Sequence, residues 1–148
     1  MSFLEKIRRY CAYQERCHSE VRRKLRELKC PPDEAEEILV ALIAGNFLNE
    51  ERFARSFARG KHNILGWGRI RIKQELNRRG ISDRLIDESI AAEISEDQYF
   101  ASIKKLAARK FKSLSGRKLA ANMKTQKIVS WLRSKGYDST EIGKLFEE

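Results

Sequence analysis

The sequence predicts an all-α protein, a helical array of tandem three-helix modules. One apolar pattern leads to this fold class because it occurs three times in the 148 residues. The copies are Val21, Leu25, Cys30, Ala35 and Leu39; Ile72, Leu76, Ile81, Ile86 and Ile90; and Ile128, Leu132, Tyr137, Ile142 and Phe146. The spacings are four, five, five and four residues in every copy. In addition, no window of five or more residues alternates between polar and apolar side chains as a strand would.

Each copy is expected to form two helices joined by a turn, since residues four apart share a helix face and both apolar stripes can face inward. A further helix with an apolar face precedes each copy. These leading helices carry Phe3, Leu4, Ile7 and Cys11; Phe53, Ala54, Phe57 and Ala58; and Phe100, Ile103, Leu106 and Ala107. We therefore expect modules at residues 1–44, 45–94 and 95–148, stacked into one continuous array. A single compact bundle is the competing architecture.

The first four helices are expected at about residues 3–15, 19–29, 33–44 and 50–63. The only prolines, Pro31 and Pro32, separate the second helix from the third, because proline cannot continue a helix. Asn49 offers an N-cap side chain to the fourth helix. Glu50 and Glu51 then place acid in its first turn, where the helix dipole favours negative charge.

The remaining five helices are expected at about residues 67–79, 83–94, 96–112, 118–135 and 139–147. Gly80 and Gly136 are expected to end two of them in a left-handed conformation. Ser95, with Gln98 three residues later, has the form of a capping box for the helix at 96–112. The first copy of the pattern has Lys29 at the position of these glycines, so we expect its turn to be built differently.

The positive charge of the protein is confined to one segment. The formal net charge is +10 and the pI is about 9.7. Between Gln98 and Tyr137 the chain has eleven Lys and Arg and no Asp or Glu, whereas the remaining residues hold 20 basic side chains against all 21 acidic ones. A localised basic surface predicts contact with a polyanion, because Lys and Arg neutralise phosphates and release counterions.

Several function classes are not expected from this sequence. The first residues lack the apolar region of a secretory signal, and the longest apolar run, residues 38–44, is too short to span a bilayer. Cys11, Cys17 and Cys30 are odd in number and lack metal-ligand spacing, which predicts buried thiols in a reducing cytoplasm. We therefore expect a cytoplasmic protein without membrane contact.

Catalysis and cofactor binding are not expected either. His18 and His62 are isolated, and the sequence shows no nucleophile with a base and no metal-like set of carboxylates. The segment Gly66-Trp67-Gly68 lacks the spacing and the Lys-Ser/Thr of a phosphate-binding loop. We expect no enzyme, no catalytic residue, no metal site and no cofactor.

Motifs in all three modules resemble one known family. The first is His18-Ser19-Glu20-Val21-Arg22-Arg23-Lys24-Leu25, and the second runs from Gly45 through Asn46-Phe47-Leu48-Asn49-Glu50-Glu51-Arg52-Phe53 to Ala54. Further motifs are Gly66-Trp67-Gly68-Arg69-Ile70, Leu76 with Arg79-Gly80-Ile81, Lys127-Ile128, Trp131-Leu132 and Lys135-Gly136-Tyr137. Together they make essentially the whole chain similar to the RecX family, regulators of the recombinase RecA. Position 49 often carries Asp in that family, whereas Asn here keeps the cap and loses a charge.

The resemblance implies a crescent of tandem three-helix modules that binds in the groove of the RecA–single-stranded DNA filament. It also implies inhibition of ATP hydrolysis and strand exchange in DNA repair and recombination. The partners implied are the RecA filament and DNA, single-stranded and also double-stranded, and we expect a monomer in solution.

The candidate binding residues are basic side chains in two clusters. The larger cluster is Lys104, Lys105, Arg109, Lys110, Lys112, Arg117, Lys118, Lys124 and Lys127. The smaller cluster is Arg69, Arg71, Lys73, Arg78 and Arg79, with Glu75 as its only internal acid. We expect both to contact DNA or an acidic recombinase surface. The alternative is a solvated helix face, balanced for the smaller cluster by acids of the helix at 83–94.

Two tryptophans could stack on bases. Trp131 follows Ile128 by three residues, which favours packing in the core. Trp67 lies between glycines before a basic helix, and both interpretations stay open for it.

Two other functions remain as alternatives. A general DNA-binding protein would also combine three-helix units with basic helices, although the last helices of the first two modules are acidic or mixed and offer no base-reading surface. A scaffold that binds an acidic protein without nucleic acid is the other alternative.

Overall fold

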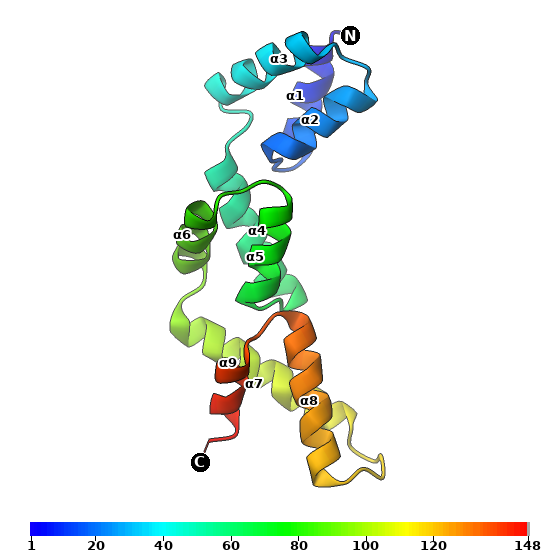
Figure 1. Cartoon of the computed structure of the whole chain (residues 1–148), viewed down its shortest axis with the longest axis vertical. Coiled ribbons are helices and arrows are strands. Elements are labelled where there is room, and N and C mark those ends of the chain that lie inside the picture. Colours follow the sequence, from blue (N-terminus) through cyan, green and yellow to red (C-terminus); the bar gives the residue numbers. More distant parts are fainter. Residues whose placement is uncertain (148) are drawn as a thin grey trace.

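The computed structural model describes residues 1–147, and these residues form nine α-helices and no strand. The helices are α1 (Phe3–Tyr13), α2 (His18–Glu27), α3 (Pro32–Ala44), α4 (Glu50–Leu65), α5 (Arg69–Arg78), α6 (Asp83–Glu93), α7 (Glu96–Ser113), α8 (Ala121–Lys135) and α9 (Ser139–Leu145). They follow one another along an elongated array, with α1 to α3 at one end and α7 to α9 at the other (Figure 1). The all-α class is confirmed, and the competing compact bundle is not formed.

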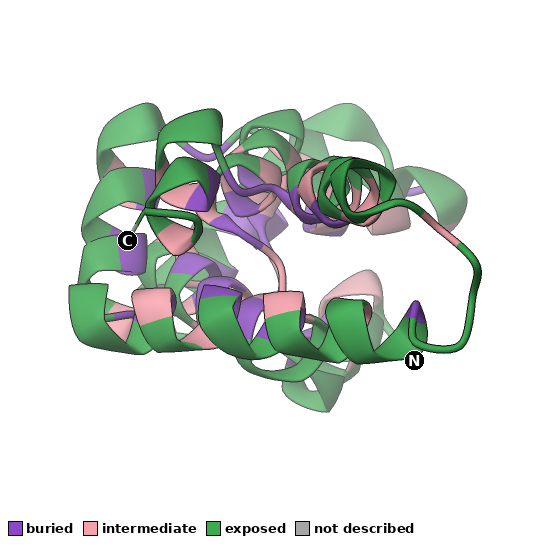
Figure 2. Ribbon diagram, turned by 90° about the horizontal axis from the view of Figure 1, so that it is seen from below, coloured by how far each residue is buried: buried purple, intermediate pink, exposed green. Residues whose placement is uncertain are grey.

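The repeated apolar pattern supplies most of the core. Thirteen of its fifteen positions are buried, and Ala35 is half-buried against its neighbours. Figure 2 shows the buried positions on the sides of the helices that face one another. Phe146 is the exception to the prediction, because it is 50% exposed. Since α9 ends at Leu145, the Phe146 ring lies at an open groove beside Phe100 and Phe111 rather than in the core.

The turns that follow α2, α5 and α8 are built alike. In each, a residue with positive φ ends the helix: Lys29 (φ 63°), Gly80 (φ 84°) and Gly136 (φ 106°). The next residue then donates its backbone N–H to the carbonyl five positions back, over 3.0 to 3.2 Å. The prediction of a different first turn was therefore wrong. The shared hydrogen bond holds Lys29 in a conformation that favours glycine.

Side-chain caps begin several helices where the sequence predicts them. Asn49 accepts from the N–H of Arg52 at 2.9 Å. Ser95 accepts from the N–H of Gln98 at 3.1 Å, but the Gln98 side chain donates to Asn63 instead of completing the capping box. Only the Ser95 part of the predicted capping box is thus formed, and the Gln98 side chain instead holds α7 against α4.

The buried residues form two separate cores. One lies among α1 to α3 and includes Ile7, Val21 and Leu42; the other is continuous through α4 to α9 and includes Ile72, Ile103 and Leu132. Cys11 and Cys30 belong to the first core and Cys17 to the second, and all three are buried thiols, as the sequence predicts. Burial raises the pKa of all three thiols.

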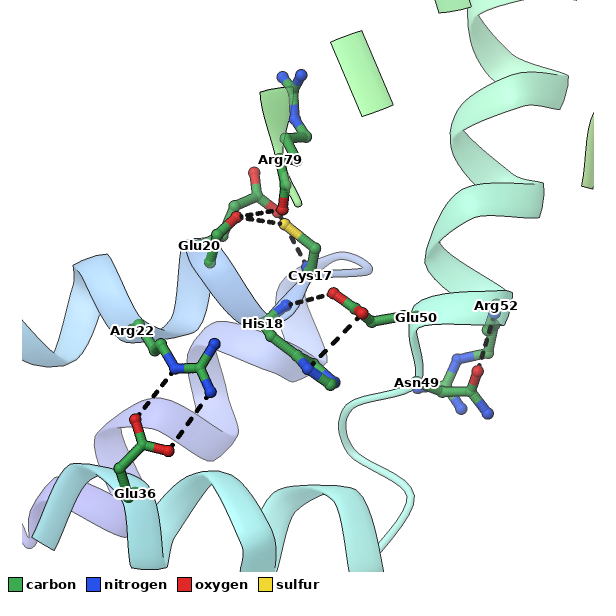
Figure 3. Close-up of polar contacts among 10 residues, drawn as sticks. Cys17, His18, Glu20, Arg22, Glu36, Asn49, Glu50, Arg52 and Arg79 are labelled. Atoms are coloured by element: carbon green, nitrogen blue, oxygen red, sulfur yellow. Dashed lines mark hydrogen bonds and ion pairs between the residues drawn. The ribbon is translucent and has the colours of Figure 1, made fainter. Parts of the chain in front are cut away.

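Polar side chains connect α1–α3 to the rest of the array (Figure 3). The Glu50 carboxylate accepts from the backbone N–H of His18 at 3.2 Å and lies 3.7 Å from its Nδ1. Arg52 donates to Glu15 at 2.6 Å, and the Ser19 hydroxyl donates to the carbonyl of Arg79 at 2.8 Å.

Backbone groups connect α5 to α8 in a closer joint. The N–H of Gly68 donates to the carbonyl of Lys135 at 2.7 Å, and that of Ile70 donates to the carbonyl of Gly136 at 3.0 Å. The N-terminus of α5 thus meets the C-terminus of α8, an arrangement in which the helix dipoles attract. A Cβ on Gly68 would collide with the backbone of Gly136. The segment Gly66-Trp67-Gly68 therefore serves a helix-to-helix contact in this fold.

Candidate nucleic-acid interface

Whether a basic side chain of this protein forms an ion pair depends on its position in the chain. Among residues 1–147, every Lys or Arg that lies within 4.0 Å of a carboxylate falls between Arg22 and Arg84. The eleven basic residues between Gln98 and Tyr137 have no such partner in this range. The segment that is basic in sequence is therefore also one in which, among the described residues, no Lys or Arg is neutralised by a neighbouring carboxylate.

Carboxylates lie against four of the five residues in the smaller predicted cluster. Arg69 pairs with Glu96 of α7 at 2.8 Å and with Glu141 of α9 at 3.8 Å. Lys73 pairs with Asp87 of α6 at 3.1 Å. Both Arg78 and Arg79 contact Glu75, at 2.8 and 3.1 Å.

Arg71 is the member of this cluster that contacts an aromatic ring instead. Its guanidinium lies 4.2 Å from the centre of the Trp67 ring and donates to the carbonyl of Ser134 at 3.4 Å. Lys61 approaches the same ring at 5.1 Å, and Phe57 contacts it edge-on at 6.2 Å. Trp67 is half-buried among these neighbours.

The larger predicted cluster is distributed over different sides of α7 and α8. Lys110, Arg117 and Lys127 come together in one groove between the two helices. Lys104 lines a second groove and lies over Phe100 at 4.6 Å. Lys124 lines neither groove, although its ammonium group lies 5.9 Å from the ring centre of Phe111. The other four members are exposed and line neither groove: Lys105, Arg109, Lys112 and Lys118.

The first groove, here called the basic groove, has a volume of about 520 Å³. It is lined by Lys110, Leu114, Arg117, Met123, Gln126, Lys127, Ser130 and Trp131. The five lining residues of α8 fall on one stripe, because they recur at spacings of three and four. This stripe lies beside Ile128 and Leu132, which face the core.

Trp131 forms an aromatic wall of the basic groove. Its side chain is half-buried and packs against the core, as the sequence favours, while its ring also borders the groove. The ammonium groups of Lys110 and Lys135 lie 5.4 and 5.5 Å from the ring centre. The lining contains three cations and no carboxylate. Such a cavity attracts an anion and offers a flat apolar surface beside it.

The second groove, here called the apolar groove, has a volume of about 550 Å³ between α7, α8 and α9. Its lining is Phe100, Lys104, Ala107, Ala108, Phe111, Ile128, Lys144, Leu145, Phe146 and Glu147. It therefore combines the rings of three phenylalanines with two lysines and one glutamate.

Two residues beside these sites were not among the predicted binding residues. Lys135 donates to the carbonyl of Leu65 at 3.0 Å and also approaches the Trp131 ring at 5.5 Å, so it lies between the two tryptophan regions. Lys61 contacts the rings of Trp67 and Phe57. The Gly-Trp-Gly segment was the available signal for Lys61, since glycine-flanked tryptophan predicts an approachable ring.

His62 is a buried structural residue. It is 3% exposed, its Nδ1 lies 2.9 Å from the Trp67 carbonyl oxygen, and its Nε2 lies 3.0 Å from the Ser102 hydroxyl. Tyr99 stacks on it at 5.5 Å, and burial raises the pKa of Tyr99 far above its ordinary value. Within residues 1–147, no group of three or more His, Cys, Asp or Glu is placed to hold a metal ion. No helix of this range is long and apolar enough to cross a bilayer.

Comparison with known proteins identifies the family. Residues 5–42 match the model of the first three-helix domain of RecX, and residues 49–90 match that of the second. The chain belongs to the RecX family. The regulatory protein RecX of Clostridium acetobutylicum is 28% identical over 149 residues, covering all of this chain and 65% of the relative. That of Lactococcus lactis subsp. cremoris strain SK11 is 30% identical over 129 residues, covering 86% and 48%.

Solved RecX structures share the fold over nearly the whole chain. One crystal structure of a regulatory protein RecX superposes with a TM-score of 0.86 and 26% identity, covering 99% of this chain and 70% of the other. The crystal structure of RecX from Lactobacillus salivarius gives 0.84 and 26%, covering 97% and 91%. This RecX family member thus spans about half to two thirds of the two curated relatives and most of the second structure.

Proposed function

We propose that this protein regulates a RecA-type recombinase by binding the filament that the recombinase forms on single-stranded DNA. Membership of a family of regulatory proteins supports the proposal. The observation that carries the DNA contact is the segment of eleven basic residues that have no carboxylate partner within residues 1–147, because such charges attract a phosphate backbone. The elongated array supports the filament contact, since a long molecule can lie along a groove and touch more than one protomer (Figure 1).

Inhibition would follow from bridging. A chain that holds neighbouring protomers together opposes the movements that accompany ATP hydrolysis and strand exchange, without any chemistry of its own. In this proposal the protein is not an enzyme and needs no cofactor. It acts as a monomer in the cytoplasm, where its buried cysteines stay reduced. The modules at 45–94 and 95–148 carry the DNA contact.

The first test is ATP hydrolysis by the cognate recombinase on single-stranded DNA, with this protein titrated below one copy per protomer. We expect inhibition at these low ratios, because one bridging molecule affects several protomers. An absence of effect in excess protein and at low salt would contradict the proposal. Specific binding to duplex DNA would then favour the general DNA-binding alternative, and capture of the recombinase after nuclease treatment would favour the scaffold.

A charge-reversal variant tests the basic segment. Replacing Lys104, Lys105, Arg109 and Lys110 with Glu should abolish association with the filament while the helical content stays unchanged, because these side chains lie outside the buried core. The control reverses four exposed cations of α1 and α2 that pair with no carboxylate of the described residues: Lys6, Arg9, Arg23 and Arg26. Equal loss in both variants would mean that net charge alone controls binding.

A further inference from the structure

The basic groove differs from the rest of the positive surface because it is a cavity with an aromatic wall. Lys110 enters from α7, Arg117 from the connection to α8, and Lys127 from α8 itself. Leu114 is buried, and Met123, which lies eight residues before Trp131 on α8, adds a further apolar side chain to the lining. The lining thus combines three cations with three apolar or aromatic side chains, and it contains no carboxylate that would compete for the cations.

The groove has the dimensions and chemistry of a site for one nucleotide. Its volume of about 520 Å³ falls within the roughly 300–1,000 Å³ of sites that hold small organic ligands. A nucleotide needs a flat apolar surface for its base and cations for its phosphate, and single-strand binding proteins combine these two features. Gln126 and Ser130 are the only uncharged polar side chains of the lining, so few groups could read the identity of a base.

We propose that the basic groove binds one nucleotide of single-stranded DNA, with the base stacked on Trp131 and the phosphate held by Lys110, Arg117 and Lys127. This inference deepens the proposed function and rests on DNA being part of the target. The ammonium groups of Lys110 and Lys135 lie 5.4 and 5.5 Å from the ring centre, so an incoming base displaces two loose contacts and leaves Lys110 to bind the phosphate. Binding here tolerates any base, because every base has a face that stacks.

The strand can continue from the groove towards α5. Lys135 approaches the Trp131 ring and donates to the carbonyl of Leu65, two residues before Trp67. The next cations in this direction are Arg71 and Lys61, which both lie over the Trp67 ring. None of these three cations pairs with a carboxylate among residues 1–147. Cationic side chains therefore connect the groove to the joint between α5 and α8.

Tryptophan fluorescence provides the test, because a base stacked on an indole quenches its emission. In a Trp67→Phe background, Trp131 is the only tryptophan of the chain. We expect a 20-residue oligo(dT) to quench this emission and heparin, a polyanion without bases, to leave it unchanged. Trp131→Leu should weaken binding of the oligonucleotide by about 5- to 150-fold, the usual range for one stacked base.

A triple variant distinguishes binding in the groove from general electrostatic attraction, and it leaves the packed indole of Trp131 in place. With Lys110→Ala, Arg117→Ala and Lys127→Ala together, quenching should disappear. The slope of log affinity against log salt should become shallower by about 0.7, because the groove holds one phosphate and each phosphate neutralised on a single strand contributes about 0.7. The matched control removes the same charge from α1 and α2, by Arg9→Ala, Arg23→Ala and Arg26→Ala, and should retain the quenching.

The possible results distinguish this inference from the proposed function. Oligonucleotide binding, measured by anisotropy, without quenching would overturn the nucleotide site and leave filament regulation standing. Quenching that survives in the triple variant would overturn the phosphate contacts. Quenching by oligo(dT) together with an unaffected recombinase ATPase would support the groove as a DNA site and contradict the proposed regulation.

Discussion

Lys29 occupies a backbone conformation that the equivalent turns assign to glycine. Its φ of 63° falls in the left-handed region, where the Cβ of an ordinary residue crowds the backbone. The turn nevertheless forms, because the N–H of Cys30 reaches the carbonyl of Leu25 at 3.0 Å and the Cys30 side chain is buried. Burial of the apolar side chains in their common register therefore outweighs the unfavourable backbone conformation of Lys29.

Lys29→Gly should therefore stabilise the protein. Relief of left-handed strain is worth about 1–2 kcal/mol, and the greater freedom of glycine in the unfolded chain offsets about 0.5–1 kcal/mol. We expect a net gain of up to about 1 kcal/mol in the free energy of unfolding of α1–α3, measured by urea titration. Gly80→Ala, at φ 84° in open space, should lose stability as the reverse control. A loss in Lys29→Gly would contradict this account of the turn.

A pair of arginines and one glutamate join α4 to α6. Arg55 and Arg59 contact Glu93 at 2.8 and 2.6 Å, and the Glu93 side chain is only 10% exposed. The hydrogen bond from Arg59, followed by that from Arg55, lowers the pKa of Glu93 below its usual range. The ionised carboxylate of Glu93 thus connects α6 to α4.

This contact predicts a dependence of stability on acid. Since the pKa of Glu93 is lower in the folded chain, the unfolded chain binds more protons as the pH falls through the ordinary Glu range near about 4.3. The contribution is present above that range and is lost below it. Urea midpoints between about pH 3 and 6 should fall less steeply for Glu93→Gln than for the wild type. Parallel curves would show that Glu93 adds nothing to the acid sensitivity.

The joint between α5 and α8 depends on two glycines. Gly68→Ala should lower the free energy of unfolding by about 1–3 kcal/mol, because its Cβ would meet the backbone of Gly136 and force the helix ends apart. Gly60→Ala is a matched control in the interior of α4, where a Cβ meets nothing within 4 Å. That variant should gain about 1 kcal/mol from helix propensity. Thermal unfolding of both variants checks the contrast. Similar shifts in melting temperature would contradict the proposed role of Gly68 in the joint.

The whole molecule consists of two parts of unequal size, α1–α3 and α4–α9. The core of α1–α3 is separate, and polar side chains such as Glu50 and Arg52 connect it to the rest. The core of α4–α9 is continuous, and backbone hydrogen bonds at Gly68 and Ile70 reinforce it. We propose that the modules at 45–94 and 95–148 behave as one mechanical unit and the module at 1–44 as another.

Amide hydrogen exchange under native conditions tests this division. Buried amides in α4 to α9 should share one opening free energy, because their core is continuous. Those of α1 to α3 should open together at a different value. A single opening free energy across both cores would show that the polar contacts at Glu50 and Arg52 couple them fully.

Local interactions explain why the helices could be predicted from the sequence. Caps and turns such as those at Asn49 and Gly80 involve residues within five positions of one another, and the apolar spacing selects the buried face. All nine expected helices occur, with ends within a few residues of the expected positions. Phe146 departs from the pattern because α9 ends before it and the groove beside it stays open.

The sequence by itself determined the all-α class, the repeated helix pairs and the segment that carries the excess charge, because each depends on residues close together in the chain. Only the tertiary structure decided which cations remain without a carboxylate. Arg69 is paired by Glu96 and Glu141, far along the chain, whereas Lys110 and Lys127 converge on Trp131 from two helices. Ion pairs and grooves form between segments that packing brings together, and spacing along one helix carries no information about that approach.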